Sequence, residues 1–206
     1  MCSKLCVMSI PEQTLFGTAC QALSTVIGQI GAEDWDRKTT PSGGFPGRIV
    51  REVVASHAKE NRWVGHVLAG GTIEDGTTLY PEYPADLSGP DAVSAWHEVT
   101  ATAASDVLAL DDPSRPVHLS FGSFGDFTAR DYLQQVITYH GFETFDLARL
   151  LGLDSTLPSD LVAGLTVIMS EVAEQWRTWG VFGPEVTVSP DANAQAKLLA
   201  LSGRTP

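Results

Sequence analysis

The chain has 206 residues, of which 43% are hydrophobic, and a formal net charge of −12. This composition predicts a soluble globular protein with one substantial core, and the acidic balance argues against nucleic acids and anionic membranes as partners, because those ligands require clustered Lys and Arg. No apolar run approaches the roughly 20 residues of a membrane span, and the N-terminus does not resemble a signal peptide.

The cysteines are odd in number and lie near the N-terminus, at positions 2, 6 and 20. This pattern suits a reducing compartment better than a disulfide framework, so we expect a cytoplasmic protein. The length does not require a second domain. We therefore expect a single domain over 1–206, in which residues 1–8 and 181–206 are peripheral tails.

Start signals and helical periodicity predict five long helices along the chain. The first begins at Ser9, where Pro11 and Glu12 complete a capping pattern, and its apolar stripe ends at Gly31. The second covers about 46–68 and stops at a pair of glycines. Both helices carry apolar residues along one side, which predicts that this side faces a core.

The middle of the chain alternates between loops and helices. The segment 72–90 is rich in Gly and Pro and predicts an ordered surface loop, and a third helix follows from Pro90 to about Asp111. Residues 117–121 alternate apolar and polar side chains, which predicts a short strand with a turn after it. Thr128 then starts the fourth helix, which extends to a glycine at position 152.

Pro158 starts the fifth helix, which continues to about Trp176. The remaining tail is predicted to be mostly extended, with a short helix at 194–201. Long amphipathic helices joined by short connections and one long crossover predict an all-α fold: an antiparallel four-helix bundle with an extra helix and a short β-strand or hairpin.

His57 is the first candidate for chemistry, because it follows Val50, Val53 and Val54 at helical spacing and points along the same apolar stripe. A buried imidazole needs a partner, since an unpaired polar group in a core is costly. On this helix alone, the pattern favours a core histidine bonded to a carbonyl or hydroxyl group over a functional residue.

The fourth helix favours a functional interpretation. His140 lies on its apolar face, and Tyr139 and Glu143 lie at the edge of that face, so the three side chains share one side of the helix. Imidazole and carboxylate groups that project from facing helices are how bundles build metal sites or acid–base sites. The alternative is a buried bond between His140 and Glu143 that only fixes the register of the helices.

Several short blocks of the sequence resemble one family in their order and spacing. They are Asp34-Trp35, Thr40-Pro41, Phe45, Val50, Ser56-His57, Glu60-Asn61-Arg62-Trp63, Leu68-Ala69-Gly70, Asp86-Leu87-Ser88-Gly89, Phe145-Asp146-Leu147-Ala148-Arg149 with Gly152, and the ending from Leu198 to Pro206. Together they resemble the metal-binding domain of mycothiol-dependent maleylpyruvate isomerases, within the DinB-like superfamily.

The resemblance implies a divalent metal, commonly zinc, and mycothiol as a thiol cofactor. The family's ligands are a histidine late in the second helix and a carboxylate and a histidine four residues apart on a later helix. Carried over, these positions are His57, Tyr139 and Glu143, so one imidazole remains and the other two ligands are changed. His57 and Glu143, helped by His140, are the residues left to hold a metal, while Ser42 replaces the cysteine of a Thr-Pro-Cys motif.

Two hypotheses from different classes follow. In the first, the chain is an enzyme acting on a small-molecule substrate, either a thiol-dependent isomerase or transferase or a metal-independent isomerase or cyclase of specialised metabolism. His57, Tyr139, His140 and Glu143 would then be its catalytic residues. In the second, the chain is a non-catalytic bundle that binds a small molecule or forms a homodimer, and its polar cluster is structural.

Overall fold

The computed structural model describes residues 10–39, 47–80, 87–120 and 126–206. These residues form helices joined by irregular segments, so the all-α class predicted from the sequence is confirmed for this part of the chain. The helices are α1 (Pro11–Ile27), α2 (Val50–Leu68), α3 (Ile73–Leu79), α4 (Gly89–Leu108), α5 (Ala129–Leu151), α6 (Ser159–Thr178) and α7 (Ala194–Leu201).

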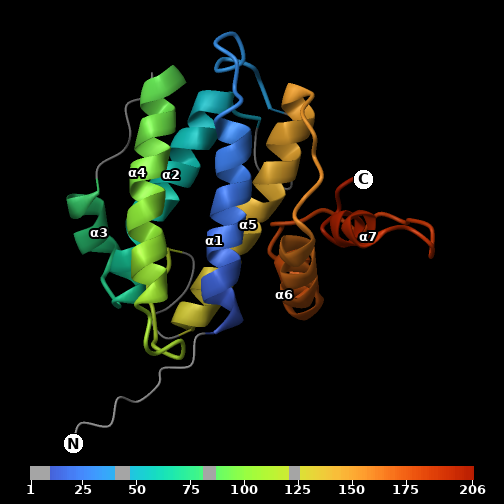
Figure 1. The fold of residues 1–206 in the computed structure, drawn as a ribbon. Helices are drawn as coiled ribbons and strands as arrows, with labels where there is room; N and C mark the ends of the chain where they lie inside the picture. The colour runs from blue at the N-terminus through green and yellow to red at the C-terminus, as the bar shows by residue number, and fades with distance from the viewer. Residues whose placement is uncertain (1–9, 40–46, 81–86, 121–125) are drawn as a thin grey trace, which may run out of the picture.

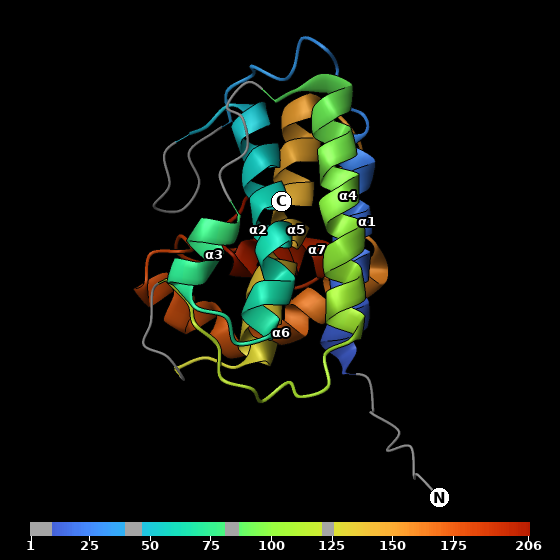
Figure 2. The same ribbon diagram turned by 90° about the vertical axis from the view of Figure 1, so that its left-hand side faces the viewer.

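Four long helices, α1, α2, α4 and α5, lie side by side (Figure 1 and Figure 2). Helix α2 packs mainly against α4 and α1 mainly against α5, while contacts of α1 with α4 and of α2 with α5 join the two pairs. The colours of Figure 1 show α1 and α5 running in one direction and α2 and α4 in the other. Two of the neighbouring pairs are therefore parallel, because the long crossover after α2 returns the chain to the end where α2 began.

The C-terminal helices pack onto one side of these four. Helix α6 contacts α1, α5 and α7. Leu198 and Leu199 of α7 are buried in the larger of two apolar clusters that make up the core. Beyond α7, Arg204 pairs with Asp146 of α5 at 2.8 Å. The end of the chain is thus tied to the same helix that carries His140.

The surface loop predicted over 72–90 is wrong in its first part, which forms α3. Thr72 caps this helix by accepting a hydrogen bond from the amide of Asp75 at 3.1 Å, a local signal that the glycines and prolines of the segment obscure. A Cβ atom on Gly76 would lie 2.5 Å from the ring of Trp63, so glycine is what allows α3 to pack closely onto α2. Six residues of the predicted loop, 81–86, lie outside the described part.

Helix α1 begins two residues after the predicted start, and Ser9 lies outside the described residues. The side chain that reaches back to the start of this helix is Gln13, whose Oε1 accepts a hydrogen bond from the Ile10 amide at 2.9 Å. Glu12 was the expected partner, but it turns into the protein and accepts a hydrogen bond from Arg130 of α5 at 2.7 Å. A charged partner on another helix has outweighed the local cap.

The strand predicted over 117–121 is absent from the described part of that segment, 117–120. Next to this segment, the structure has an isolated antiparallel β-bridge between Pro116 and Thr128 in place of a strand. Proline has no amide hydrogen, so it cannot extend a ladder on its own side. The last residue of the predicted strand and the turn after it lie outside the described residues.

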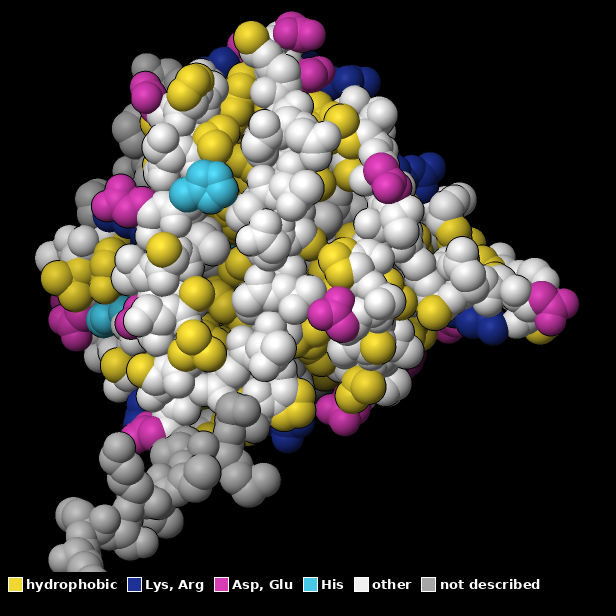
Figure 3. All heavy atoms as spheres, viewed as in Figure 1, with side chains coloured by type: hydrophobic (Ala, Val, Ile, Leu, Met, Phe, Trp, Pro, Cys, Tyr) yellow, Lys and Arg dark blue, Asp and Glu magenta, His cyan; other side chains and the backbone are white. Residues whose placement is uncertain are grey.

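The described surface is mixed in character. Among the helices that the structure describes, none has both the length and the apolar composition that crossing a membrane requires. Figure 3 shows the face over α1, α4 and α6, on which Lys and Arg side chains lie mostly along the edges and do not gather into one patch.

Candidate functional site

Two histidines from different helices meet inside the protein. The apolar stripe of α2 carries His57 inward beside Val53 and Val54, and the stripe of α5 carries His140 inward beside Val136. His57 is 1% exposed and His140 is 0% exposed, and their Nδ1 atoms lie 2.8 Å apart. The structure therefore brings together the two imidazoles that the sequence places on inward faces.

Tyr139 and Glu143 lie beside His57. The ring of Tyr139 stacks on the imidazole, with centroids 3.7 Å apart and planes 15° apart, and its hydroxyl group shares a hydrogen bond with Ser56 at 2.9 Å. Oε2 of Glu143 lies 3.5 Å from Nε2 of His57, and the Glu143 side chain is 18% exposed. This contact lacks hydrogen-bond geometry, so His57 Nε2 is a buried nitrogen without a hydrogen-bond partner among the described residues.

Asn61 closes the inner end of the group. It lies one helical turn after His57 on α2 and is 2% exposed. Its Oδ1 is 2.8 Å from Nε2 of His140, while its Nδ2 donates to Thr100 of α4 at 2.9 Å and, more weakly, to the sulfur of Cys20 of α1 at 3.9 Å. We call the five residues His57, Asn61, Tyr139, His140 and Glu143 the histidine cluster.

Aromatic rings hold His140 from two sides. The ring of Trp96 lies edge-on to the imidazole, with centroids 5.6 Å apart, and the centroid of the Phe16 ring is 6.2 Å from it. Phe16 belongs to the larger apolar cluster of the core and Trp96 to the smaller one. The Trp96 indole is itself fixed, because its Nε1 donates to Ser24 at 2.7 Å. His140 is thus a polar group between two apolar clusters, which makes its hydrogen bonds indispensable.

Burial sets the protonation states around His57. Desolvation lowers the pKa of His57 well below the usual 6.5, and the positive charge of Arg48 lowers it further. Desolvation also lowers the pKa of His140, with a smaller contribution from His57. Desolvation raises the pKa of Glu143 above 4.5, although Arg48 and Arg204 oppose this shift. At the 3.5 Å contact, burial therefore favours the neutral form of the His57 imidazole and the protonated form of the Glu143 carboxyl group.

Tyr139 keeps its phenolic proton in this environment. Desolvation raises its pKa above 10, and this outweighs the opposing effects of the Ser56 hydroxyl group and the positive charge of Arg48. The hydroxyl group is therefore a hydrogen-bond donor with a cation beside it. Such a pair of groups stabilises negative charge that develops on a ligand oxygen.

Sequence reasoning missed three residues of this region. Asn61 carried a signal, since it is four residues after His57 and a polar side chain at that spacing faces the same way. Ser56 lies at the edge of the stripe and becomes relevant only through its bond to Tyr139. Arg48 precedes α2 in a segment without periodicity, so no pattern in the sequence points to it.

The residues present do not fit the three-ligand zinc site implied by the resemblance. Within the described ranges, no group of three or more His, Cys, Asp or Glu side chains is arranged to hold a metal ion. His57 and His140 direct their Nδ1 atoms at each other, and the hydroxyl group of Tyr139 bonds to Ser56. Only Nε2 of His57 and Glu143 are left as neighbouring donors, and zinc needs at least one more. Ser42 lies outside the described residues.

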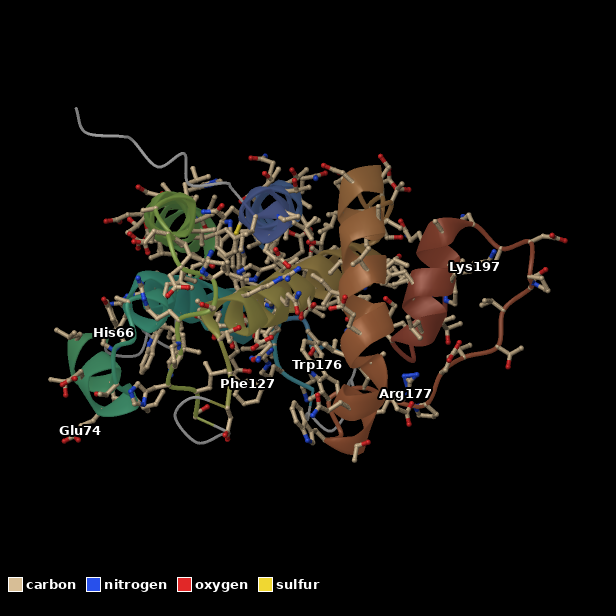
Figure 4. The ribbon with its side chains drawn as sticks, turned by 90° about the horizontal axis from the view of Figure 1, so that it is seen from below. His66, Glu74, Phe127, Trp176, Arg177 and Lys197 are labelled. Atoms are coloured by element: carbon tan, nitrogen blue, oxygen red, sulfur yellow. The ribbon has the colours of Figure 1, made fainter. Side chains whose placement is uncertain are left out.

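Two cavities of the described structure lie away from the histidine cluster. One of about 470 Å³ is bounded by the start of α5 and the end of α6, where Phe127 and Trp176 lie close together (Figure 4). The other, of about 280 Å³, lies between α2 and α4 beside His66. Neither of these two cavities is lined by a residue of the histidine cluster, whose partly exposed members are Tyr139 and Glu143.

Comparisons of the chain with protein-family models, with curated proteins and with solved structures gave no significant match.

Proposed function

We propose that the chain is an enzyme that moves protons on a small organic molecule, as a metal-independent isomerase or cyclase on a DinB-like four-helix bundle. The observation that carries the proposal is the buried Nε2 atom of His57, which has no hydrogen-bond partner among the described residues and lies 3.5 Å from a carboxyl oxygen of Glu143. A buried donor or acceptor without a partner is costly, and a bound ligand is one way to supply the missing bond.

The two groups suit opposite halves of a proton shuttle. Neutral His57 accepts a proton from a carbon next to a carbonyl group, and protonated Glu143 returns one to another atom of the same molecule. Burial shifts both pKa values in the directions that these roles require, because it lowers the pKa of His57 and raises the pKa of Glu143. In this proposal the enolate oxygen lies next to the Tyr139 hydroxyl group and Arg48, whose positive charge acts on Tyr139.

The thiol-dependent version of the proposal differs in its requirements. It needs a metal to bind mycothiol as a thiolate, and the donor set around His57 does not provide three ligands. Thiol dependence without a metal is compatible with the same proton chemistry, with the thiol adding to an unsaturated substrate. The alternative from another class, a non-catalytic binding or dimerising bundle, predicts no proton transfer under any condition.

The test is solvent deuterium exchange. Wild-type protein is incubated in D2O with a panel of small 2-oxo, 3-oxo and unsaturated carbonyl compounds, each with and without a low-molecular-weight thiol, and loss of substrate proton signals is followed by NMR. We expect exchange with at least one class of compound and a loss of about 10²–10⁴-fold in Glu143→Gln.

Glu60→Gln is the matched control. Glu60 is also a partly buried carboxyl group whose pKa is raised by desolvation. It differs from Glu143 because it accepts a hydrogen bond from the Tyr132 hydroxyl group at 2.7 Å, and neither Glu60 nor Tyr132 belongs to the histidine cluster. It should keep the wild-type exchange rate. Exchange that survives in Glu143→Gln, or a protein that exchanges none of the panel, would contradict the proposal.

A further inference from the structure

We infer that Asn61 is a positioning residue that fixes which nitrogen of each histidine carries the proton, so that His57 and His140 act as one base whose accepting atom is Nε2 of His57. The inference deepens the proposed function and rests on it. It is carried by a continuous chain of contacts, from Thr100 through Asn61 and His140 to His57.

The orientation of the Asn61 amide is the first step. With Nδ2 toward Thr100 Oγ1 and Cys20 Sγ, both N–H groups meet an acceptor, and Oδ1 accepts from His140. In the reversed orientation, Nδ2 would meet His140 Nε2 as its one described partner. One N–H group of a side chain that is 2% exposed would then have no acceptor. Satisfaction of both donors therefore selects the first orientation.

The remaining protons follow from this orientation. Because Oδ1 of Asn61 is an acceptor only, Nε2 of His140 must carry a hydrogen. His140 is fully buried and neutral, so its Nδ1 has a lone pair and must accept. Its partner at 2.8 Å, Nδ1 of His57, is then the donor. His57 is neutral as well, which leaves a lone pair on Nε2, the atom that faces Glu143.

This order of protons gives the pair a defined reaction. When a substrate C–H proton transfers to Nε2 of His57, an N–H bond forms there and the electron pair of the C–H bond stays on the substrate as an enolate. The hydrogen on Nδ1 of His57 can move 2.8 Å to Nδ1 of His140, which breaks one N–H bond and forms another. The positive charge then resides on His140, whose two N–H groups donate to His57 and to Asn61. Glu143 returns a proton to the substrate, His140 passes its Nδ1 hydrogen back to Nδ1 of His57, and Nε2 of His57 gives its proton to the Glu143 carboxylate, so atoms and charge balance and the cluster regains its starting state.

His66 provides an internal standard for testing the inference. Its Nε2 lies 2.8 Å from the carbonyl oxygen of Thr72, an atom that only accepts, so His66 carries its hydrogen on Nε2. The neutral tautomer of each histidine can be identified in the full-length protein by long-range ¹H–¹⁵N correlation NMR of the rings. We expect His66 and His140 to carry hydrogen on Nε2 and His57 to carry it on Nδ1.

Two variants at Asn61 decide whether this residue sets the order. Asn61→Asp keeps an acceptor for His140 and should retain both wild-type tautomers. Asn61→Leu removes the acceptor, so His140 should turn its hydrogen to Nδ1 and His57 should then carry hydrogen on Nε2, with exchange of substrate protons reduced by a factor of ten or more. If Asn61→Leu fails to fold, the wild-type and Asn61→Asp spectra still decide.

Each outcome bears on one claim. A wild-type spectrum with hydrogen on Nε2 of His57 overturns the inference, and so does an Asn61→Leu spectrum with unchanged tautomers. Neither result depends on a substrate. The proposed function fails separately, when the tautomers are as expected but no compound of the panel exchanges protons.

Discussion

Helix α5 carries two carboxyl groups one turn apart, and they have opposite surroundings. Asp146 is paired with Arg204, whose Nε lies 3.1 and 2.9 Å from its two oxygens and whose Nη2 lies 2.8 Å from Oδ2. The guanidinium also donates to Ser202 at 3.2 Å and lies over the ring of Phe142 at 4.4 Å. Every group of this network has a partner within the chain. Among the residues that the structure describes, Glu143 has the His57 imidazole at 3.5 Å and no cation at a comparable distance.

The two carboxyl groups therefore suit different roles: Asp146 stabilises the fold, and Glu143 is a candidate for chemistry. A closed network such as Asp146–Arg204 has no free valence for a ligand, and its effect is to hold the end of the chain against α5. The histidine cluster is closed at its inner end by Asn61 and open at its outer end, where Nε2 of His57 meets Glu143. Under the proposed function, a substrate would complete the network at this open end, beside the partly exposed carboxyl group.

The largest expected effect comes from removing each of the two carboxyl groups in turn. Glu143→Gln should reduce proton exchange about 10²–10⁴-fold and leave the free energy of unfolding unchanged or slightly higher, because it removes a desolvated acid. Asp146→Asn should leave exchange within a factor of about three and lower stability. Exchange kinetics and urea denaturation of the two variants provide the measurements, and equal losses of activity would break the comparison.

Removing the cation of the closed network should have a moderate effect. Arg204→Ala leaves Asp146 without its partner in a partly buried place, so we expect the free energy of unfolding to fall by about 1–2 kcal/mol, between the values for exposed and buried pairs. Arg37→Ala is the control, since its contact with Asp34 at 3.3 Å is exposed. It should cost no more than about 0.5 kcal/mol in the same denaturation experiment. If both variants lost a similar amount of unfolding free energy, the Asp146–Arg204 pair would be no more stabilising than an exposed ion pair.

Stability should depend on pH through the two buried histidines. Their pKa values are lowered in the folded state, so below pH 6.5 the unfolded chain binds more protons and the free energy of unfolding falls as pH falls. Each histidine contributes a slope of up to about 1.4 kcal/mol per pH unit in this window. His140→Gln should remove about one such contribution, measured by denaturation at several pH values. A slope that is unchanged in His140→Gln would count against buried neutral histidines.

The smallest expected effect concerns metal. Because the cluster lacks a third ligand, dialysis against a chelator should change the Tm by less than about 1 °C, and metal analysis should find no stoichiometric zinc. Stoichiometric zinc whose removal lowers the Tm would restore the metal-dependent mechanism that the sequence resemblance implies.

Periodicity in the sequence identifies the inward faces of α2 and α5, and therefore places His57 and His140 in the interior. It does not reveal that Nδ1 faces Nδ1, because that contact depends on the rotamers of two side chains and on the separation of two helices. The running direction of α4 and the existence of α3 depend on a crossover rich in Gly and Pro, which has no period. Arg48 enters the site from such a segment as well.

The most direct test is to titrate His57 and Glu143 in one sample by NMR. The account predicts that the His57 imidazole stays neutral as the pH falls below 6.5, while the Glu143 carboxyl group still holds its proton above pH 4.5. A His57 pKa above 6.5 together with a Glu143 pKa below 4.5 would mean a closed ion pair like that of Asp146 and Arg204, and would contradict an open acid–base site.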